Sequence, residues 1–230
     1  MARKPRLFVT GIPYHVVQRG NNKGQIFFSD NDYSFFLDVL QEAKAKHPCL
    51  IYSYCLMSNH FHLLIEPNEK ENISLLMKLL GAKYVRYINK AHGRTGTLWE
   101  GRFKCSMVGE EVYFLSCMHY IENNPLRAGI ADYPESYRWS SYRARAFGEK
   151  NRILDLCPWY NNLGYDMKER QQKYRQFFEV SIPEFTLELI REMTKKGGIV
   201  GSDKFKEQIG NLLHKEIIIR SPGRPKKQEK

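Results

Sequence analysis

The sequence contains five cysteines but no C-x-x-C pair. An odd number of cysteines argues against a disulfide framework, and the absence of the short spacing argues against a treble-clef zinc site. No apolar run approaches the length of a membrane span, and the basic start of the chain is not followed by a long apolar segment. We therefore expect a reducing compartment, the cytoplasm, and no membrane partner.

The sequence also has fewer acidic than basic side chains. The chain has 25 Asp and Glu residues against 36 Lys and Arg, which gives a formal net charge of +11 over 230 residues. An excess of this size indicates an anionic partner, and nucleic acid is the usual candidate. The length allows one main domain with an appendage, and we find no internal repeat.

Apolar periodicity predicts alternating strands and helices in the first 130 residues. Period-two patterns predict strands at 14–19, 50–56, 60–65 and 98–108. Helices are predicted from a cap at Ser29 or Asp30, over the apolar stripe 73–88, and from Glu110 until Pro125 ends it. The order βαββαβα predicts an α+β, ferredoxin-like fold, with a four-stranded antiparallel sheet and helices packed on it.

The sequence predicts three regions. Residues 1–150 form the main domain, 151–215 a helical extension that is a candidate DNA-binding unit, and 216–230 a basic tail. Helical patterns cover 167–180 and 184–196, and Ser202 can cap a further helix after a Gly-Gly link, which could be a helix-turn-helix. The tail around Arg224 resembles the core of an AT-hook, which lays its arginine in a narrow A·T minor groove, or is a nonspecific electrostatic arm.

The most informative motif is His60-Phe61-His62. Successive side chains of a strand point to opposite faces, so the alternation puts both imidazoles on one face and Phe61, Leu63 and Ile65 on the other. Two imidazoles on a common strand face form a metal-chelating geometry. The motif therefore predicts a metal site.

Tyr120 and Asn124 lie one turn apart on a common face of the helix predicted to start at Glu110. If that face meets the histidine strand, a metal held by His60, His62 and the Asn124 carboxamide lies beside the Tyr120 hydroxyl. That arrangement suits phosphodiester cleavage, because a phenol is a poor nucleophile until it is activated. The ligand set accommodates Mn²⁺ well and Mg²⁺ acceptably, and does not exclude Zn²⁺.

Other residues compete for these roles. Tyr113 lies on the same helical stripe as Tyr120, and a tyrosine on a helix is more often a packing residue than a nucleophile. Asn123 is the alternative metal ligand. His15 and His119 are interpreted as structural or solvent-facing residues, and Glu100 as an ion-pair partner.

These motifs resemble a known family. His60-Phe61-His62 resembles the HUH motif, in which U is a bulky hydrophobic residue, and residues 120–129 resemble the tyrosine helix of the REP-associated tyrosine transposases. Stretches 14–22, 55–64, 96–104 and 139–142 match the same family in the expected order. Together the matching segments cover roughly residues 5–165.

The resemblance implies a single-strand-specific DNA endonuclease and strand-transferase that acts on palindromic repeats able to fold into hairpins. Tyr120 would attack the scissile phosphate, become linked to the 5′ phosphate and release a 3′ hydroxyl. His60, His62 and Asn124 would hold Mg²⁺ or Mn²⁺. Such a protein is expected near the nucleoid, as a monomer or homodimer. The candidate DNA-contacting residues in the matching segments are Arg19, Asn21, Asn22, Arg102, Lys104 and Arg127.

Two rival functions stay open. A domesticated DNA- or RNA-binding protein would keep the fold without turnover. A metal-dependent hydrolase using activated water would form no covalent protein–DNA adduct.

Overall fold

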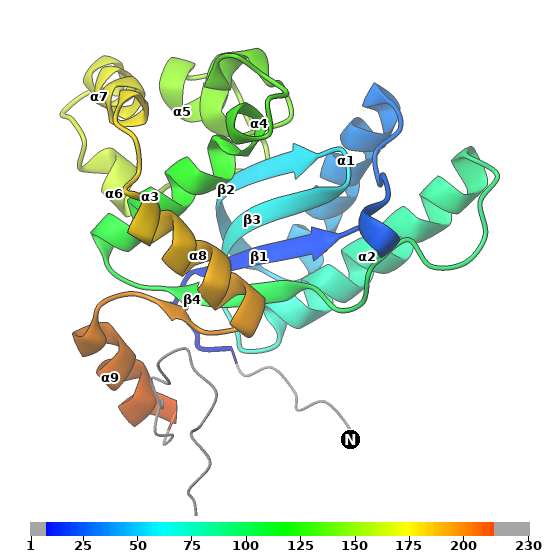
Figure 1. Ribbon diagram of the computed structural model, residues 1–230, viewed down its shortest axis with the longest axis horizontal. Helices are drawn as coiled ribbons and strands as arrows, with labels where there is room; N and C mark the ends of the chain where they lie inside the picture. The colour runs from blue at the N-terminus through cyan, green and yellow to red at the C-terminus, as the bar shows by residue number, and fades with distance from the viewer. Residues whose placement is uncertain (1–7, 214–230) are drawn as a thin grey trace, which may run out of the picture.

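Alternating apolar residues build a five-stranded sheet at the centre of the protein (Figure 1). The computed structural model describes residues 8–213. The strand order is β2-β3-β1-β4-β5. All neighbouring strands are antiparallel except β4 and β5, which are parallel. The strands are β1 (Tyr14–Arg19), β2 (Cys49–Met57), β3 (His60–Pro67), β4 (Lys104–Val108) and β5 (Ile199–Val200).

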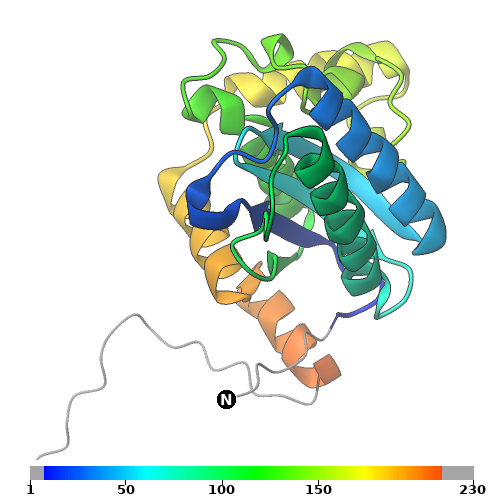
Figure 2. The same cartoon turned by 90° about the vertical axis from the view of Figure 1, so that its right-hand side faces the viewer.

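Helices cover both faces of this sheet. The helices α1 (Asp30–Lys46) and α2 (Asn72–Ala91) run side by side on one face, where they bury Phe61, Leu63 and Ile65 (Figure 2). On the other face, α3 (Glu111–Glu122) packs on β2 and β3, and α8 (Glu184–Lys196) packs on β4 and β5. Residues of opposite strand parity therefore belong to separate cores, as the alternation predicts.

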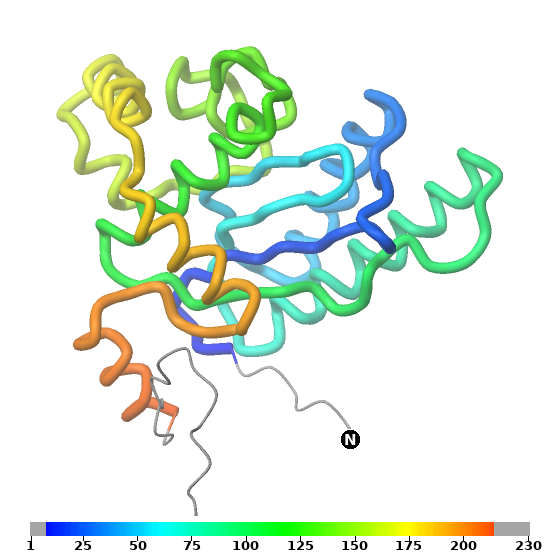
Figure 3. The backbone as a smooth tube through the Cα atoms, in the orientation of Figure 1, coloured from blue at the N-terminus to red at the C-terminus, as the bar shows by residue number. Residues whose placement is uncertain are grey.

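The chain beyond α3 wraps around this second face. After α7 (Met167–Glu179) it crosses the sheet as α8, reverses at Gly197-Gly198, adds β5 to the edge and continues into α9 (Asp203–Leu213) (Figure 3). The remaining elements are α4 (Asn124–Arg127), α5 (Tyr142–Phe147), α6 (Pro158–Asn161) and the 3₁₀ turns η1 (Asn21–Lys23) and η2 (Pro134–Ser136). Within the described range, no helix is long and apolar enough to cross a membrane.

The α+β fold is confirmed, but the prediction was wrong in two details of the sheet. The sheet has five strands instead of four, because the two-residue β5 is too short to show an alternation in the sequence. The strand predicted at 98–108 begins only at Lys104. Residues 100–103 bulge out between a hydrogen bond from Glu100 N to Arg19 O and the first β1–β4 pair, and Gly101 there has φ +123°.

Asp32 fixes the start of α1 from a buried position, with 1% of its surface exposed. Its carboxylate accepts the N–H groups of Phe28 at 2.7 Å and Ser29 at 2.9 Å, and contacts His92 Nε2 at 3.1 Å. Burial alone would raise the pKa of Asp32, but the hydrogen bonds from His92 and the two backbone groups outweigh it and lower the pKa. The ionised carboxylate therefore stabilises the fold.

We expect Asp32→Ala to lower the free energy of unfolding by about 2 kcal/mol at pH 7, because two buried N–H groups lose their acceptor. A depressed carboxyl pKa contributes stability above its unfolded value and loses it as pH falls through the folded value. The difference from wild type in urea denaturation should therefore shrink below about pH 4. The control is Asp38→Ala on the same helix, which breaks only an exposed ion pair with Arg152. An equal loss in both variants would contradict this role.

Candidate functional site

A cleft of about 540 Å³ opens on the α3 and α8 side of the sheet. Its floor comes from β1 and β3, and its walls come from α3, α4, α8 and the segment that leads into β4. The structure brings together the predicted tyrosine, both histidines of the motif and the predicted carboxamide. The lining residues are His15, Val17, Gln18, Arg19, His60, His62, Glu100, Arg102, Lys104, Tyr120, Asn124, Arg191, Thr194 and Lys195.

His60 and His62 present neutral imidazoles to this cleft. Burial lowers the pKa of His60 to about 4, with Arg19 adding to the effect, and lowers the pKa of the fully buried His62 well below its ordinary value. The two ring centroids are 4.9 Å apart. A neutral imidazole has one nitrogen without a proton, and only that nitrogen can bind a metal.

The protonated nitrogen of His60 is fixed by Asn59. The Asn59 Nδ2 donates to Lys23 O at 3.1 Å, which orients the Asn59 Oδ1 toward His60 Nδ1 at 2.5 Å. Because Oδ1 can only accept, His60 Nδ1 carries the proton. His60 Nε2 is left as the unprotonated nitrogen.

A buried chain of hydrogen bonds from Thr194 of α8 through His15 determines which nitrogen of His62 carries the proton. The Thr194 hydroxyl donates to Ile190 O at 2.7 Å, so its oxygen accepts from His15 Nδ1 at 2.9 Å. His15 then carries its proton on Nδ1, and its Nε2 accepts from His62 Nδ1 at 2.8 Å. Burial lowers the pKa of His15 to about 3, which keeps this ring neutral. His62 Nε2 is therefore unprotonated, and it is buried with no hydrogen-bond partner among the described residues.

Asn124 completes a donor set that suits a divalent metal. Its Nδ2 donates to Tyr120 O at 2.8 Å and to Ile121 O at 3.1 Å, and because both partners are carbonyls, Oδ1 takes no part in these bonds. The helix predicted to run until Pro125 ends earlier than expected. Helix α3 ends at Glu122, and Asn124 opens the short α4 with Pro125 in its first turn, where the missing N–H costs little.

The residues fit the predicted metal, since two histidines that each keep an unprotonated nitrogen and one asparagine line a single cleft. Such a mixed set accommodates Mn²⁺ or Mg²⁺. Between residues 8 and 213 no three His, Cys, Asp or Glu side chains form a metal-binding group. The alternative ligand, Asn123, does not line the cleft, although its Oδ1 is buried without a partner in the described chain.

Tyr120 lies beside the histidines with 8% of its surface exposed. Its ring centroid is 5.9 Å from that of His62 and 5.7 Å from that of His15, both edge-on. Arg127 places its guanidinium 4.9 Å from the centre of the same ring. Tyr113, the competing tyrosine, is not part of the cleft.

The end of α3 that carries Tyr120 is anchored by a buried carboxyl. Glu122 accepts from the Tyr174 hydroxyl at 2.8 Å, from Ser53 at 3.1 Å and from Ser141. Burial raises the pKa of Glu122 to about 7, against the opposing effect of these hydrogen bonds. These contacts tie the tyrosine helix to β2 and α7 and hold Tyr120 in place.

The cleft is strongly basic. Arg19, Arg102 and Lys104, all predicted to contact DNA, line it, and α8 adds Arg191 and Lys195. Glu100 is the one acidic residue of the lining. The predicted Asn21 and Asn22 lie in η1, outside the lining, and Arg224 lies outside the described residues.

Sequence reasoning did not foresee all contacts of the site. His15, interpreted as structural or solvent-facing, is a buried structural residue, and its hydrogen bond to His62 was not predicted. The α8 residues Arg191, Thr194 and Lys195 carry no local motif. The one signal for the contact between His15 and His62 was the position of His15 in β1. His15 pairs with Leu64, which lies on the same face of β3 as His62.

We expect Thr194→Val to weaken Mn²⁺ binding about tenfold, because His15 and then His62 lose the acceptor that fixes their protons. Binding can be measured by the electron paramagnetic resonance signal of free Mn²⁺. The matched control is Thr186→Val, an equally buried threonine of α8 that does not line the cleft. Unchanged Mn²⁺ affinity in a folded Thr194→Val protein would show that this chain of hydrogen bonds has no part in ligand orientation.

Comparisons with known proteins identify a family and a shared fold. The family model described as transposase, IS200 like, matches residues 8–124, which end at Asn124. A Haemophilus influenzae protein assigned as a REP-associated tyrosine transposase is 22% identical over 147 residues, which is 54% of this chain and 84% of the relative.

One solved structure shares the fold. It is a REP-associated tyrosine transposase bound to a REP hairpin, and it superposes with a TM-score of 0.52 at 15% sequence identity. The match covers 68% of this chain and 93% of that chain. At this identity the likeness concerns the fold alone.

Proposed function

Because the chain belongs to the IS200-like transposase family, we propose that it cleaves and rejoins single-stranded DNA with Tyr120 as the nucleophile. One observation carries the proposal. Tyr120 lies edge-on to His62, whose Nε2 is buried, unprotonated and unpartnered in the same basic cleft. A packing tyrosine would not need such neighbours.

In the proposed step the Tyr120 oxygen loses its proton to water and attacks the scissile phosphorus. The new bond joins the phenolic oxygen to the 5′ phosphate, and the bond from phosphorus to the 3′ oxygen breaks. That oxygen takes up a proton and leaves as a 3′ hydroxyl. The reverse attack by a 3′ hydroxyl reseals the strand and frees the tyrosine, so no energy source is needed.

His60, His62 and Asn124 are the proposed holders of Mg²⁺ or Mn²⁺. The metal would make phosphorus more electrophilic and offset the charge that develops on the phosphate oxygens. Arg19, Arg102 and Lys104 would bind the flanking phosphates, and Arg127 would keep the Tyr120 ring oriented. Such positioning of the reacting groups would supply much of the rate of the reaction.

The proposed substrate is repeat DNA that folds into a hairpin with single-stranded flanks. Two arguments support it: the five basic side chains of the cleft, and the fold shared with a transposase whose structure contains a REP hairpin. A retained DNA-binding role without turnover is the second candidate. The intact donor set and tyrosine favour the enzyme over that candidate.

The test is incubation of the protein with a 5′-labelled and a 3′-labelled hairpin oligonucleotide in Mn²⁺. We expect a denaturation-resistant adduct that carries the 3′ label only, because the 5′ phosphate of the downstream strand joins the protein. Mass spectrometry should place it on the peptide containing Tyr120, and EDTA should abolish it. Cleavage with free 5′ phosphates and no adduct would indicate activated water, and tight binding with no cleavage would indicate a binding protein.

A further inference from the structure

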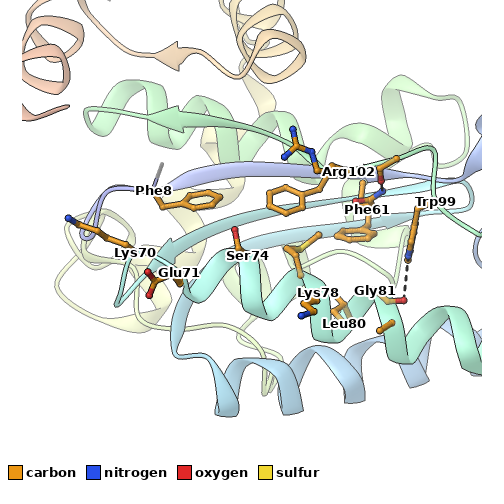
Figure 4. A pocket seen from close by; sticks show the side chains of 15 residues that line it. Phe8, Phe61, Lys70, Glu71, Ser74, Lys78, Leu80, Gly81, Trp99 and Arg102 are labelled. Carbon is orange, nitrogen blue, oxygen red and sulfur yellow. Dashed lines mark hydrogen bonds between the residues drawn. The ribbon is translucent and has the colours of Figure 1, made fainter. Parts of the chain in front are cut away.

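A second cavity, of about 740 Å³, lies between the strands and helix α2 on the opposite face of the sheet (Figure 4). Phe61, which separates the two histidines of β3, points into it because strand alternation turns it away from the cleft. Figure 4 shows Phe8, Phe61 and Trp99 between the strands and α2. We call this cavity the aromatic pocket; its rings are Phe8, Phe61, Trp99 and Phe103.

The indole of Trp99 is held in place at one end of the aromatic pocket. Its Nε1 donates to Gly81 O of α2 at 3.4 Å, and a Cβ at Gly81 would lie only 3.3 Å from that nitrogen. Glycine leaves room for this approach, and a larger residue would need a small shift of the indole. The hydrogen bond orients the ring of Trp99 in the pocket.

The aromatic pocket and the catalytic cleft meet at the bulge of residues 100–103. Gln18 and Arg102 line both cavities. Gln18 stands in β1 opposite the bulge and donates its Nε2 to Gly101 O at 2.9 Å. One strand of DNA could thus contact both cavities by passing around a single short segment.

The charged residues and the rings of the pocket favour an anionic ligand with a flat apolar part. Three are basic and one is acidic: Lys70, Lys78, Arg102 and Glu71. Aromatic rings next to basic side chains are the usual combination for unpaired nucleotides, because bases stack on the rings while the cations contact the backbone.

We propose that the aromatic pocket takes one unpaired nucleobase of the DNA strand whose scissile phosphate lies in the catalytic cleft. The proposal rests on the proposed function for the identity of that strand. Arg102, at the junction, contacts the phosphate between the bound base and the cleavage point. The pocket thereby selects where the strand is cut by fixing one base at a set distance from Tyr120.

The test is an abasic scan of the single-stranded flanks of a fluorescent hairpin oligonucleotide, read by anisotropy. Removal of one particular base should raise the Kd of the wild-type protein by about 5- to 150-fold, the usual range for loss of one base–aromatic stack. Ser74→Phe, which places a ring inside the pocket, should bind the intact and abasic oligonucleotides equally. Leu75→Phe is the control, since Leu75 is exposed on α2 and does not line the pocket.

The proposal would be overturned by a scan in which no abasic position changes the Kd of the wild-type protein (a flat scan). It would also be overturned by the same base dependence in Ser74→Phe. The Tyr120 adduct, measured at saturating DNA, separates this proposal from the function on which it rests. A flat scan with a normal adduct rejects only the pocket. A base-dependent Kd with no adduct rejects the cleavage chemistry and leaves the pocket as a DNA-binding site.

Discussion

Tyr120→Phe should lower the yield of covalent protein–DNA adduct by at least about a thousandfold, because it removes the attacking oxygen and leaves the ring in place. The phenyl ring still fits edge-on against His62 and His15 and under Arg127. We therefore expect the Kd for the hairpin oligonucleotide to change by less than about threefold, since no phosphate-binding side chain is lost. Denaturing gels measure the adduct, and anisotropy measures binding.

Tyr113→Phe is the matched control for this prediction. Tyr113 lies on the same helix but outside the cleft, so its loss of a hydroxyl should leave adduct formation unchanged. If Tyr120→Phe cuts DNA at the wild-type rate, the nucleophile is water. If Tyr113→Phe is the inactive variant, Tyr113 is the nucleophile, and the alignment with the family motif that selected Tyr120 is wrong.

His62→Ala should weaken Mn²⁺ binding by about a hundredfold or more, because it removes the buried Nε2 that has no other partner in the described chain. Adduct formation should fall in parallel at fixed Mn²⁺. Raising the Mn²⁺ concentration should restore part of the rate, since Tyr120 and the basic side chains remain. Electron paramagnetic resonance of free Mn²⁺ gives the affinity independently of activity.

His119→Ala is the control for loss of a buried histidine. His119 packs against Phe178, with 4.3 Å between ring centroids, and does not line the cleft. The variant should be less stable than wild type but bind Mn²⁺ with unchanged affinity. Equal loss of Mn²⁺ binding in both variants would mean that the effect comes from destabilisation and not from a lost ligand.

Local sequence patterns predicted the central elements well. The alternation at β1 gave its bounds, Tyr14–Arg19, and the apolar stripe of α2 gave its position, because each signal depends on neighbours a few residues away. Strand β5 was missed because two residues show no period. The start of β4 was placed too early because the period-two pattern of the sequence continues through the bulge at Gly101, whose residues do not pair in the sheet.

The sequence by itself determined which side chains lie together: His60 with His62 on one face of a strand, and Tyr120 with Asn124 one turn further on, at the junction of α3 and α4. It also predicted the excess of positive charge that lines the cleft. These properties follow from backbone periodicity and composition, so no tertiary contact is needed to infer them.

Only the tertiary structure decided how these pairs meet and which nitrogen of each histidine is free. The proton of His62 is fixed by His15 from β1 and Thr194 from α8, and the two cavities are joined through Gln18 and the bulge before β4. Each of these contacts joins segments that are distant in the sequence. Their geometry depends on packing of the whole sheet, so no local pattern records it.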